Sequence, residues 1–345
     1  MRARSSALFD AASQLRGPRR RSPDAFLQKG PLMSKTVFLL ILSLFAAVAP
    51  AAEKPEKVEV AIVTKAMDSE FWRTVREGAE RFAETREDMH LIVIHPSRET
   101  DIERQIEILY DLAKWKVDAV AVTLCGMQEM IPALENLERS EIPFVIFDGD
   151  IDIDMPMKKA YVGSENYEGG ALAGRYVAEH LPDGGSVAII TGVMGHGPHI
   201  ARVMGFQNAL ARRPDIRVLS QQAANSLRTR GRAVMRNIIE NHPRVDFVFA
   251  TNDEMALGAA EVAHLLERRV GIVGFDGTRQ ARDAIRDGVI SATVYSHSFD
   301  LGYETAKAAY MAAKGEPQPD YVPIEFSIIT KDNLEDPSTA GGDTP

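Results

Sequence analysis

The sequence has very little cysteine: Cys125 is the only one among 345 residues. A single thiol excludes an internal disulfide, and no surrounding motif marks it as a nucleophile or a metal ligand. Because Cys125 ends the apolar stretch VDAVAVTLC, we expect a buried structural thiol.

The chain is also short of positive charge, with 40 Lys and Arg against 49 Asp and Glu and a formal net charge of −9. Residues 1–51 hold eight of the basic and two of the acidic side chains, so the remainder has 32 basic and 47 acidic residues and a net charge of −15. An acidic surface argues against nucleic acid as a partner, because phosphate backbones require a basic footprint.

Common catalytic motifs are missing as well. The sequence contains no G-x-S-x-G, H-E-x-x-H, G-x-x-x-x-G-K-[ST] or G-x-G-x-x-G pattern, which would indicate hydrolase, zinc, phosphate or dinucleotide sites. We therefore predict that the protein is not an enzyme and has no cofactor and no metal. Four alternating aspartates from Asp148 to Asp154 allow a calcium loop, but that loop needs Gly at its sixth position and Glu at its twelfth, which are absent.

There is one marked hydrophobic run, close to the start of the chain. Residues 33–51 read MSKTVFLLILSLFAAVAPA, a lysine and an apolar run followed by a small-x-small site that ends at Ala51. The run is shorter than the ~20 residues that span a bilayer. We predict a signal peptide cleaved near Ala51 and a protein of the periplasm or extracellular space. A membrane anchor is the alternative.

The residues before this run do not alter the prediction of export. Residues 1–32 are rich in arginine, but Met33 alone would start a complete signal. We interpret them as an upstream extension, with the true start at Met1 or Met33. A twin-arginine signal around Arg19, Arg20 and Arg21 is the alternative, although Pro23 and Asp24 fit it poorly.

From residue 58 to about 296, short apolar runs alternate with amphipathic stretches, a pattern typical of parallel sheets covered by helices. The strands fall into two sets, so we predict an α/β fold with two doubly wound parallel-sheet lobes. The expected strands are 58–63, 90–95, 118–124, 143–148, 186–192, 215–221, 247–251, 270–276 and 290–295, with one more in VPIEFSII. The span 149–162 interrupts the pattern and is interpreted as a crossover, and residues 332–345 as a flexible tail.

In such sheets ligands bind beyond the carboxyl ends of the strands. The polar residues at or just after predicted strand ends are Thr64, Asp68, Asp148, Asn252 and Asp276, and the aromatic pair Phe71 and Trp72 follows the first strand. Rings that stack on C–H faces and side chains that bind hydroxyls suit a sugar. Alternatives stay open: one aromatic in the core, Asn252 or Asp253 as a helix cap, and Asp276 as a turn residue.

Six stretches in order, AIVTKAMDSEFW, FVIFDGD, YVGSENYEGGALAG, RVMGFQNAL, FATNDEMALGAA and VGIVGFDGT, resemble the ribose-binding-protein-like branch of the type I periplasmic binding proteins. The resemblance covers residues 58 to about 330. It implies that Phe71 and Trp72 sandwich a sugar ring and that Asp148, Asn252 and Asp276 bind hydroxyls. Arg202 matches a family arginine.

The sequence also departs from the family at several ligand positions. Gly149 and Ile200 stand where ribose binders have arginines, Ser296 replaces a glutamine and Ser226 an aromatic residue. These differences argue against ribose specificity while leaving the binding mode intact. The nearby His196, His199, Tyr295 and His297 are candidates for compensating contacts.

The resemblance further implies three crossings between lobes, which assigns 57–162 with 297–319 to one lobe and 163–296 with 320–331 to the other. The expected function is capture of a small sugar-like ligand by a monomer that delivers it to an ABC permease. The alternative is a binding protein that reports to a sensor kinase or chemoreceptor. A lac-repressor-like regulator would share the fold, but it would carry an N-terminal helix-turn-helix in place of the predicted signal peptide.

Overall fold

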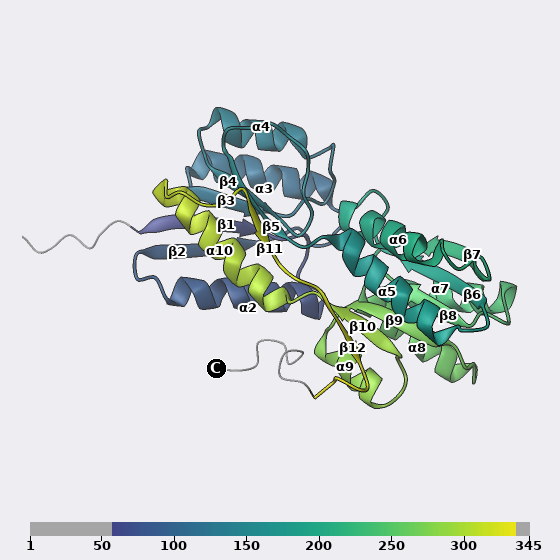
Figure 1. The fold of residues 1–345 in the computed structure, drawn as a ribbon. Coiled ribbons are helices and arrows are strands. Elements are labelled where there is room, and N and C mark those ends of the chain that lie inside the picture. Colours follow the sequence, from purple (N-terminus) through teal and green to yellow (C-terminus); the bar gives the residue numbers. More distant parts are fainter. Residues whose placement is uncertain (1–56, 336–345) are drawn as a thin grey trace, which may run out of the picture. The chain divides into compact units, whose positions relative to one another are not determined.

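The computed structural model describes residues 57–335, in which two six-stranded sheets form (Figure 1). The first sheet has the order β11-β5-β4-β3-β1-β2, and every neighbouring pair is parallel. The sheet and its helices are called the first lobe below. Its strands are β1 (Val58–Val63), β2 (Met89–Ile94), β3 (Ala119–Val122), β4 (Phe144–Phe147), β5 (Lys158–Gly163) and β11 (Tyr321–Pro323).

Helices cover both faces of the first sheet. They are α2 (Glu70–Glu84), α3 (Ile102–Trp115), α4 (Ile131–Arg139) and α10 (Ser298–Lys314). The core that contains α2 and α10 lies on one face, and the core that contains α3 and α4 lies on the other. At Gly302 in α10 a Cβ atom would meet the Val75 carbonyl oxygen at 1.8 Å, so glycine lets α10 approach α2 closely.

The second sheet has the order β12-β10-β9-β8-β6-β7 and is parallel except for the β10–β12 pair. Helices α5 and α6 pack on one face and α7, α8 and α9 on the other, and together they form the second lobe. Its elements are α5 (Asn166–His180), β6 (Gly185–Thr191), α6 (Gly197–Leu210), β7 (Ile216–Ala223), α7 (Arg228–Asn241), β8 (Phe247–Ala250), α8 (Asp253–Leu265), β9 (Gly271–Asp276), α9 (Arg279–Arg286), β10 (Ala292–Tyr295) and β12 (Ser327–Thr330).

The chain passes between the sheets at three places, after β5, after β10 and after β11. Here the sequence-based boundaries need a correction. VPIEFSII is not one strand, because β11 pairs in parallel with β5 of the first sheet while β12 pairs antiparallel with β10 of the second. The third crossing therefore lies between Pro323 and Ser327 instead of at 319/320.

Two further expectations were wrong. The span 149–162 is not only a crossover, since Lys158–Gly163 forms β5 beside β4. The predicted flexible tail begins too early, because Leu334 is buried in the core of the second lobe and Asn333 donates a 2.8 Å hydrogen bond to the Ile328 carbonyl.

The predicted signal peptide and residues 336–345 lie outside the described residues. Within the described part, no helix combines the length and apolarity that crossing a bilayer requires.

Candidate ligand-binding site

The strand order places polar residues from both lobes at facing carboxyl ends. Asp148 follows β4, Asn252 follows β8 and Asp276 ends β9. Asp148 has a φ of 67° and Asp276 a φ of 116°, values that non-glycine residues seldom adopt. Such backbone strain is concentrated at functional sites, and here it accompanies two carboxyl groups that line the same cavity.

A small cavity of about 30 Å³, called the central cavity below, lies between these strand ends. It is lined by Lys65, Ser69, Phe71, Trp72, Glu99, Asp148, Pro198, His199, Arg202, Asn252 and Asp276. Six of these were predicted from sequence. Pockets that hold small molecules usually measure about 300–1,000 Å³, so a sugar can enter only if the lobes separate or side chains rotate.

Three predicted residues do not line the central cavity. Thr64 is fully buried and donates its hydroxyl to the Ala66 carbonyl at 3.0 Å. Ser296 donates to the Asp276 backbone oxygen at 3.1 Å and so supports that residue. Asp68 lines a neighbouring cavity of about 60 Å³ together with Arg98, Ser226 and other residues.

Lys65, which sequence reasoning missed, forms a buried ion pair in the cavity wall. Its ammonium lies 2.8 Å from Asp148 Oδ2, and Thr123 donates to the same oxygen at 3.3 Å. Burial acts to raise the pKa of Asp148, but the charges of Lys65 and Arg202 outweigh it, and the pKa is lowered. Asp148 is therefore held ionised, as an acceptor for donors on a ligand.

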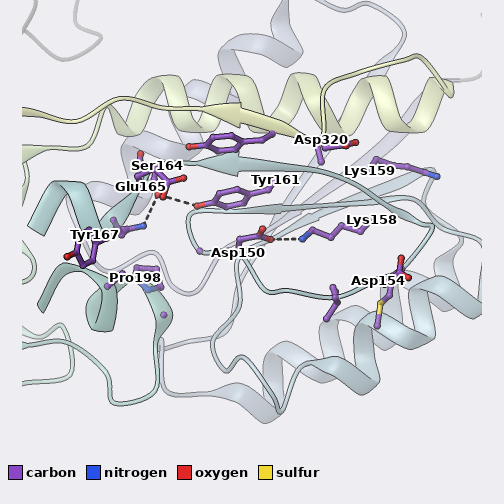
Figure 2. Close-up of a pocket in the computed structure, with 18 residues that line it drawn as sticks. Asp150, Asp154, Lys158, Lys159, Tyr161, Ser164, Glu165, Tyr167, Pro198 and Asp320 are labelled. Atoms are coloured by element: carbon purple, nitrogen blue, oxygen red, sulfur yellow. Dashed lines mark hydrogen bonds and ion pairs between the residues drawn. The ribbon is translucent and has the colours of Figure 1, made fainter. Parts of the chain in front are cut away.

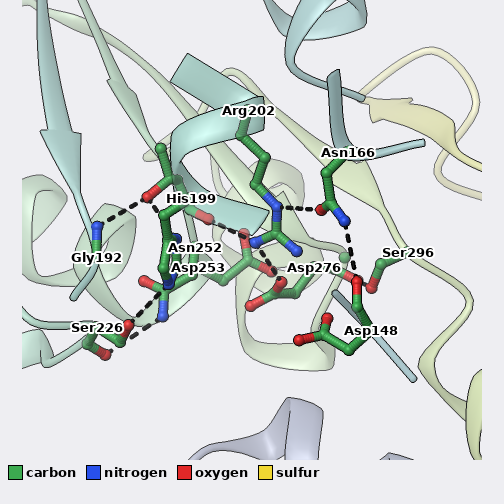
Figure 3. Close-up of polar contacts among 12 residues, drawn as sticks. Asp148, Asn166, Gly192, His199, Arg202, Ser226, Asn252, Asp253, Asp276 and Ser296 are labelled. Atoms are coloured by element: carbon green, nitrogen blue, oxygen red, sulfur yellow. Dashed lines mark hydrogen bonds and ion pairs between the residues drawn. The ribbon is translucent and has the colours of Figure 1, made fainter. Parts of the chain in front are cut away.

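Arg202 links the two lobes through a buried network (Figure 3). Its guanidinium donates to Asn166 Oδ1 and to the Thr251 carbonyl, both at 2.8 Å. Asn166 in turn donates to the Asp148 backbone oxygen at 3.1 Å. Arg202 also stacks on Phe275, with its central carbon 3.8 Å from the ring centroid. These contacts fix a positive charge beside the cavity.

Asp276 and Asp253 are both buried, but only Asp276 lines the cavity. Burial raises the pKa of Asp276 well above its usual value, with a partly opposing effect of Arg202, whose nitrogen lies 3.6 Å from its carboxyl oxygen. Asp253 instead accepts from the Thr278 backbone N–H and the Thr293 hydroxyl, both at 2.7 Å. Asp253 is therefore a structural residue and not a helix cap.

Asn252 is both a helix cap and a lining residue. Its Oδ1 accepts from the Met255 N–H at 3.0 Å at the start of α8, while Nδ2 donates to the Ser226 carbonyl at 3.3 Å. Its side chain also borders the central cavity. Asn252 can therefore cap α8 and border the cavity at the same time.

Both aromatic residues of α2 border the cavity and touch the core. Phe71 is 7% and Trp72 3% exposed, and their rings meet edge to face with centroids 4.7 Å apart. Trp72 also contacts Phe147 edge to face at 6.5 Å. Both rings belong to the first turn of α2, where Ser69 caps the helix by accepting from the Trp72 N–H at 3.3 Å.

Two histidines lie in the turn that starts α6. His199 is held by the Thr251 and Ser226 hydroxyls at 2.9 and 3.1 Å, and burial lowers its pKa well below the usual value. Burial also lowers the pKa of His196 to about 3, with Lys65 acting in the same direction, although the nearby Cys125 backbone opposes the shift. Both rings are therefore neutral at ordinary pH.

At the two positions where the resemblance implies arginines, Gly149 and Ile200, the structure places no side chain in the cavity lining. A Cβ atom on Gly149 would lie 2.8 Å from the Pro198 ring, so a side chain at this position would require Pro198 to move. Ile200 is 48% exposed, away from the cavity lining. Lys65 and His199 supply polar groups to the cavity instead.

A larger groove of about 720 Å³ lies beside the central cavity and shares Pro198 with it (Figure 2). Its walls carry the Asp150–Lys158 ion pair at 2.7 Å and the stacked rings of Tyr161 and Tyr321. None of the predicted site residues lines it. Asp148 and Asp150 pair with lysines, which leaves the calcium interpretation without support.

Comparison with known proteins shows what kind of fold surrounds this cavity. A model of the family described as "Periplasmic binding protein domain" matches residues 60–317. The chain belongs to the periplasmic binding protein family. This membership confirms the predicted fold class. It also confirms the prediction that the protein is a solute-binding protein and not an enzyme.

Several relatives of this periplasmic binding protein are named for sugars. The ribose import binding protein of Bacillus subtilis is 29% identical over 289 residues, covering 80% of this chain and 92% of the relative. A solute-binding protein of Actinobacillus succinogenes with bound D-allose is 27% identical with a TM-score of 0.75, covering 81% and 99% of the two chains. One from Bacillus halodurans with bound myo-inositol is 25% identical with a TM-score of 0.77, covering 84% and 99%.

Proposed function

We propose that this protein captures a monosaccharide or a related polyol between its two lobes and delivers it to a membrane permease of the ABC class. The observation that carries the proposal is the meeting of Asp148, Asn252 and Asp276 with the Phe71–Trp72 pair around one cavity. Carboxylates and an amide match hydroxyl groups, and aromatic faces match the C–H faces of a sugar ring.

In this proposal Phe71 and Trp72 contact the ring, while Asp148, Asn252, Asp276 and Arg202 bind its hydroxyls. Thr64 and Ser296 act behind them as supporting residues, and Asp68 lies near the entrance. The relatives named for ribose and the solved structures with D-allose and myo-inositol support a neutral polyhydroxy ligand. Ligand that touches both lobes favours their closed arrangement.

The proposal is tested by a thermal-shift screen of purified residues 52–345 against pentoses, hexoses and polyols. A ligand present at 100 times its dissociation constant stabilises the folded state by about 2.7 kcal/mol. At least one neutral sugar or polyol should raise the melting temperature, and charged amino acids should not. A screen in which only amino acids or peptides stabilise the protein would contradict the proposal.

Delivery to a permease is separable from sensing in cells. Deleting the gene should abolish uptake of the sugar found in the screen, and re-expressing the Asp276→Asn variant should not restore it. Normal uptake together with loss of a sugar-induced transcriptional response would instead indicate a partner of the sensor type.

Export is also part of the proposal. Cleavage after Ala51 would leave Ala52 at the N-terminus of the mature protein. N-terminal sequencing of the secreted form should find this residue within one or two positions. A folded extracytoplasmic protein that retains residues 1–50 would contradict the signal-peptide assignment.

A further inference from the structure

Glu99 of the first lobe presents an unused acceptor atom close to the cavity. It lies between β2 and α3, and its Oε1 accepts from Trp72 Nε1 at 2.9 Å. This bond fixes the carboxylate, whose other oxygen, Oε2, is buried and has no hydrogen-bond partner among the described residues. The Glu99 side chain lines the central cavity.

His196 of the second lobe faces it across the gap between the lobes. The side chain is 1% exposed, and neither ring nitrogen makes a well-formed hydrogen bond to the residues that the structure describes, although the Cys125 backbone lies close enough to the ring to raise its pKa. Its Nδ1 lies 3.9 Å from Glu99 Oε2, too far for a direct hydrogen bond. Leaving such groups unpaired when buried costs folding free energy, so the pair calls for a bound partner: a water molecule in the ligand-free protein, or a ligand group that replaces it.

The chemistry of the pair limits what that partner is. Glu99 Oε2 can only accept a hydrogen, whereas the neutral imidazole can carry its hydrogen on Nδ1 and donate it. A group between the two atoms must donate to the carboxylate, and it accepts from or donates to Nδ1 according to which ring nitrogen carries the hydrogen. A hydroxyl serves both tautomers, while an ether or carbonyl oxygen only accepts, and the nearby Lys65 ammonium disfavours a second cation.

A metal ion is the competing occupant, because ligand atoms of Glu99, His196 and His199 lie within 4.8 Å of one another. Two observations disfavour it. Both nitrogens of His199 already have hydroxyl partners, Thr251 and Ser226. The N-terminus of α6, where His196 is the cap, and the nearby Lys65 ammonium also place positive charge beside the site.

From this arrangement we infer that Glu99 and His196 form a subsite that binds one hydroxyl group of the ligand and couples it to closure of the lobes. The inference rests on the proposed function, since it assigns a further contact to the same sugar. It restricts the ligand class to polyols that retain a hydroxyl at one particular ring position.

The test measures ligand affinity by calorimetry for D-allose and for its 2-, 3-, 4- and 6-deoxy analogues, with D-ribose and 2- and 3-deoxyribose as the second series. The variants are His196→Phe and Glu99→Gln, which keeps an oxygen for Trp72. Matched controls are His264→Phe and Glu103→Gln, which alter exposed residues of the same lobes.

For the unaltered protein we expect one deoxy analogue to bind about tenfold or more weakly than the parent sugar, as for a lost hydrogen bond to a charged group. In His196→Phe this difference should fall to about twofold or less, and it should persist in both controls. Equal deoxy penalties in His196→Phe and in the unaltered protein would overturn the inference while leaving sugar binding intact. If neither parent sugar saturates the unaltered protein, the same comparison is made with the deoxy analogues of the sugar that the stability screen identifies; if no sugar or polyol saturates it, sugar binding fails and the inference falls with it.

A second readout separates ligand binding from a structural role. Removing an unpaired buried polar group should leave the ligand-free protein at least as stable, so His196→Phe should match or exceed the unaltered protein in urea denaturation at pH 7.5. A clear loss of ligand-free stability would indicate a structural role and overturn the inference.

Titration of the untagged protein with ZnCl₂ should show no saturable binding. Zinc binding that His196→Phe abolishes would instead assign the pair to a metal and overturn the inference.

Discussion

Asp253 and Asp276 are both buried carboxyl groups of the second lobe, yet their surroundings give them different roles. Asp253 is satisfied by protein donors, Thr278 and Thr293. Asp276 faces the cavity, and burial leaves it with a raised pKa. The same substitution at the two positions therefore separates ligand binding from folding.

Asp276→Asn should weaken sugar binding by about 1–3 kcal/mol, because an amide nitrogen replaces one carboxyl oxygen and leaves a ligand hydroxyl or the amide unpaired in a water-poor cavity. Asn tolerates the positive φ at this position, so ligand-free stability should change by less than about 1 kcal/mol. Asp253→Asn should do the opposite and cost about 1–3 kcal/mol of unfolding free energy. Calorimetric titration and urea denaturation measure the two effects, and equal affinity losses in both variants would refute the division of roles.

Trp72 borders the cavity, while the other tryptophan, Trp115, is 59% exposed at the end of α3. Ligand should therefore change the fluorescence of a Trp115→Phe variant and leave that of Trp72→Phe unchanged. Trp72→Phe should also weaken binding by about 1 kcal/mol, since a smaller ring makes less contact. A ligand-induced signal carried by Trp115 would place Trp72 in the core alone.

The cavity positions of Asp148, Asn252 and Asp276 were predictable, because the carboxyl ends of parallel strands meet at the same edge of a sheet. Lys65 and Glu99 were not predicted, since Lys and Glu are rarely found inside a protein; Lys65 is buried and Glu99 lines the cavity only because several loops meet there. His199 was noted as a loop histidine, but its role required the positions of Thr251 and Ser226. Thr64 and Ser296 lie at the predicted strand ends, yet their hydroxyls bond to backbone carbonyls.

Among the elements, strands with continuous apolar runs were predicted within a few residues, because both faces of a parallel sheet are buried. Strand β5 was missed because its sequence KKAYVG begins with two lysines and reads as loop. The division of the last segment into β11 and β12 was missed because VPIEFSII is short and mostly apolar and so reads as one strand, while the partners of its two halves belong to different sheets.

One contact between elements of different lobes is suited to stabilising the closed form. Glu70, at the start of α2, accepts a 2.7 Å hydrogen bond from the backbone N–H of Arg279, the first residue of α9. A carboxylate at a helix N-terminus is favourable because it meets unpaired N–H groups and the positive end of the helix dipole.

Glu70→Ala should therefore speed ligand release by roughly 2- to 10-fold, the value of one hydrogen bond present only between the lobes. Stopped-flow displacement measures this rate. Glu77→Ala, on the exposed side of the same helix, is the matched control and should release ligand at the unaltered rate. An unchanged rate in Glu70→Ala would show that this contact does not hold the lobes together.

For the folded molecule as a whole, burial of His196 makes the free energy of unfolding depend on pH. Its pKa is about 3 when folded and 6.5 in the usual case, so the unfolded chain binds the proton first as pH falls. Stability is therefore full above pH 6.5 and is lost progressively below it, by about 2 kcal/mol between pH 7.5 and pH 5 from this group. In urea denaturation, His196→Phe should lose about 2 kcal/mol less unfolding free energy than the unaltered protein between pH 7.5 and pH 5. Identical pH profiles of the two proteins would show that His196 does not titrate with a lowered pKa.

The central claim is that one sugar or polyol binds between the two lobes, at the cavity that Asp148, Asn252 and Asp276 line together. Calorimetric titration of the unaltered protein with the sugar found by the stability screen tests it most directly. The account predicts saturable binding of one sugar per chain, weakened by about 1–3 kcal/mol in Asp276→Asn. Binding that this substitution leaves unchanged, or no saturable binding of any sugar or polyol, would contradict it.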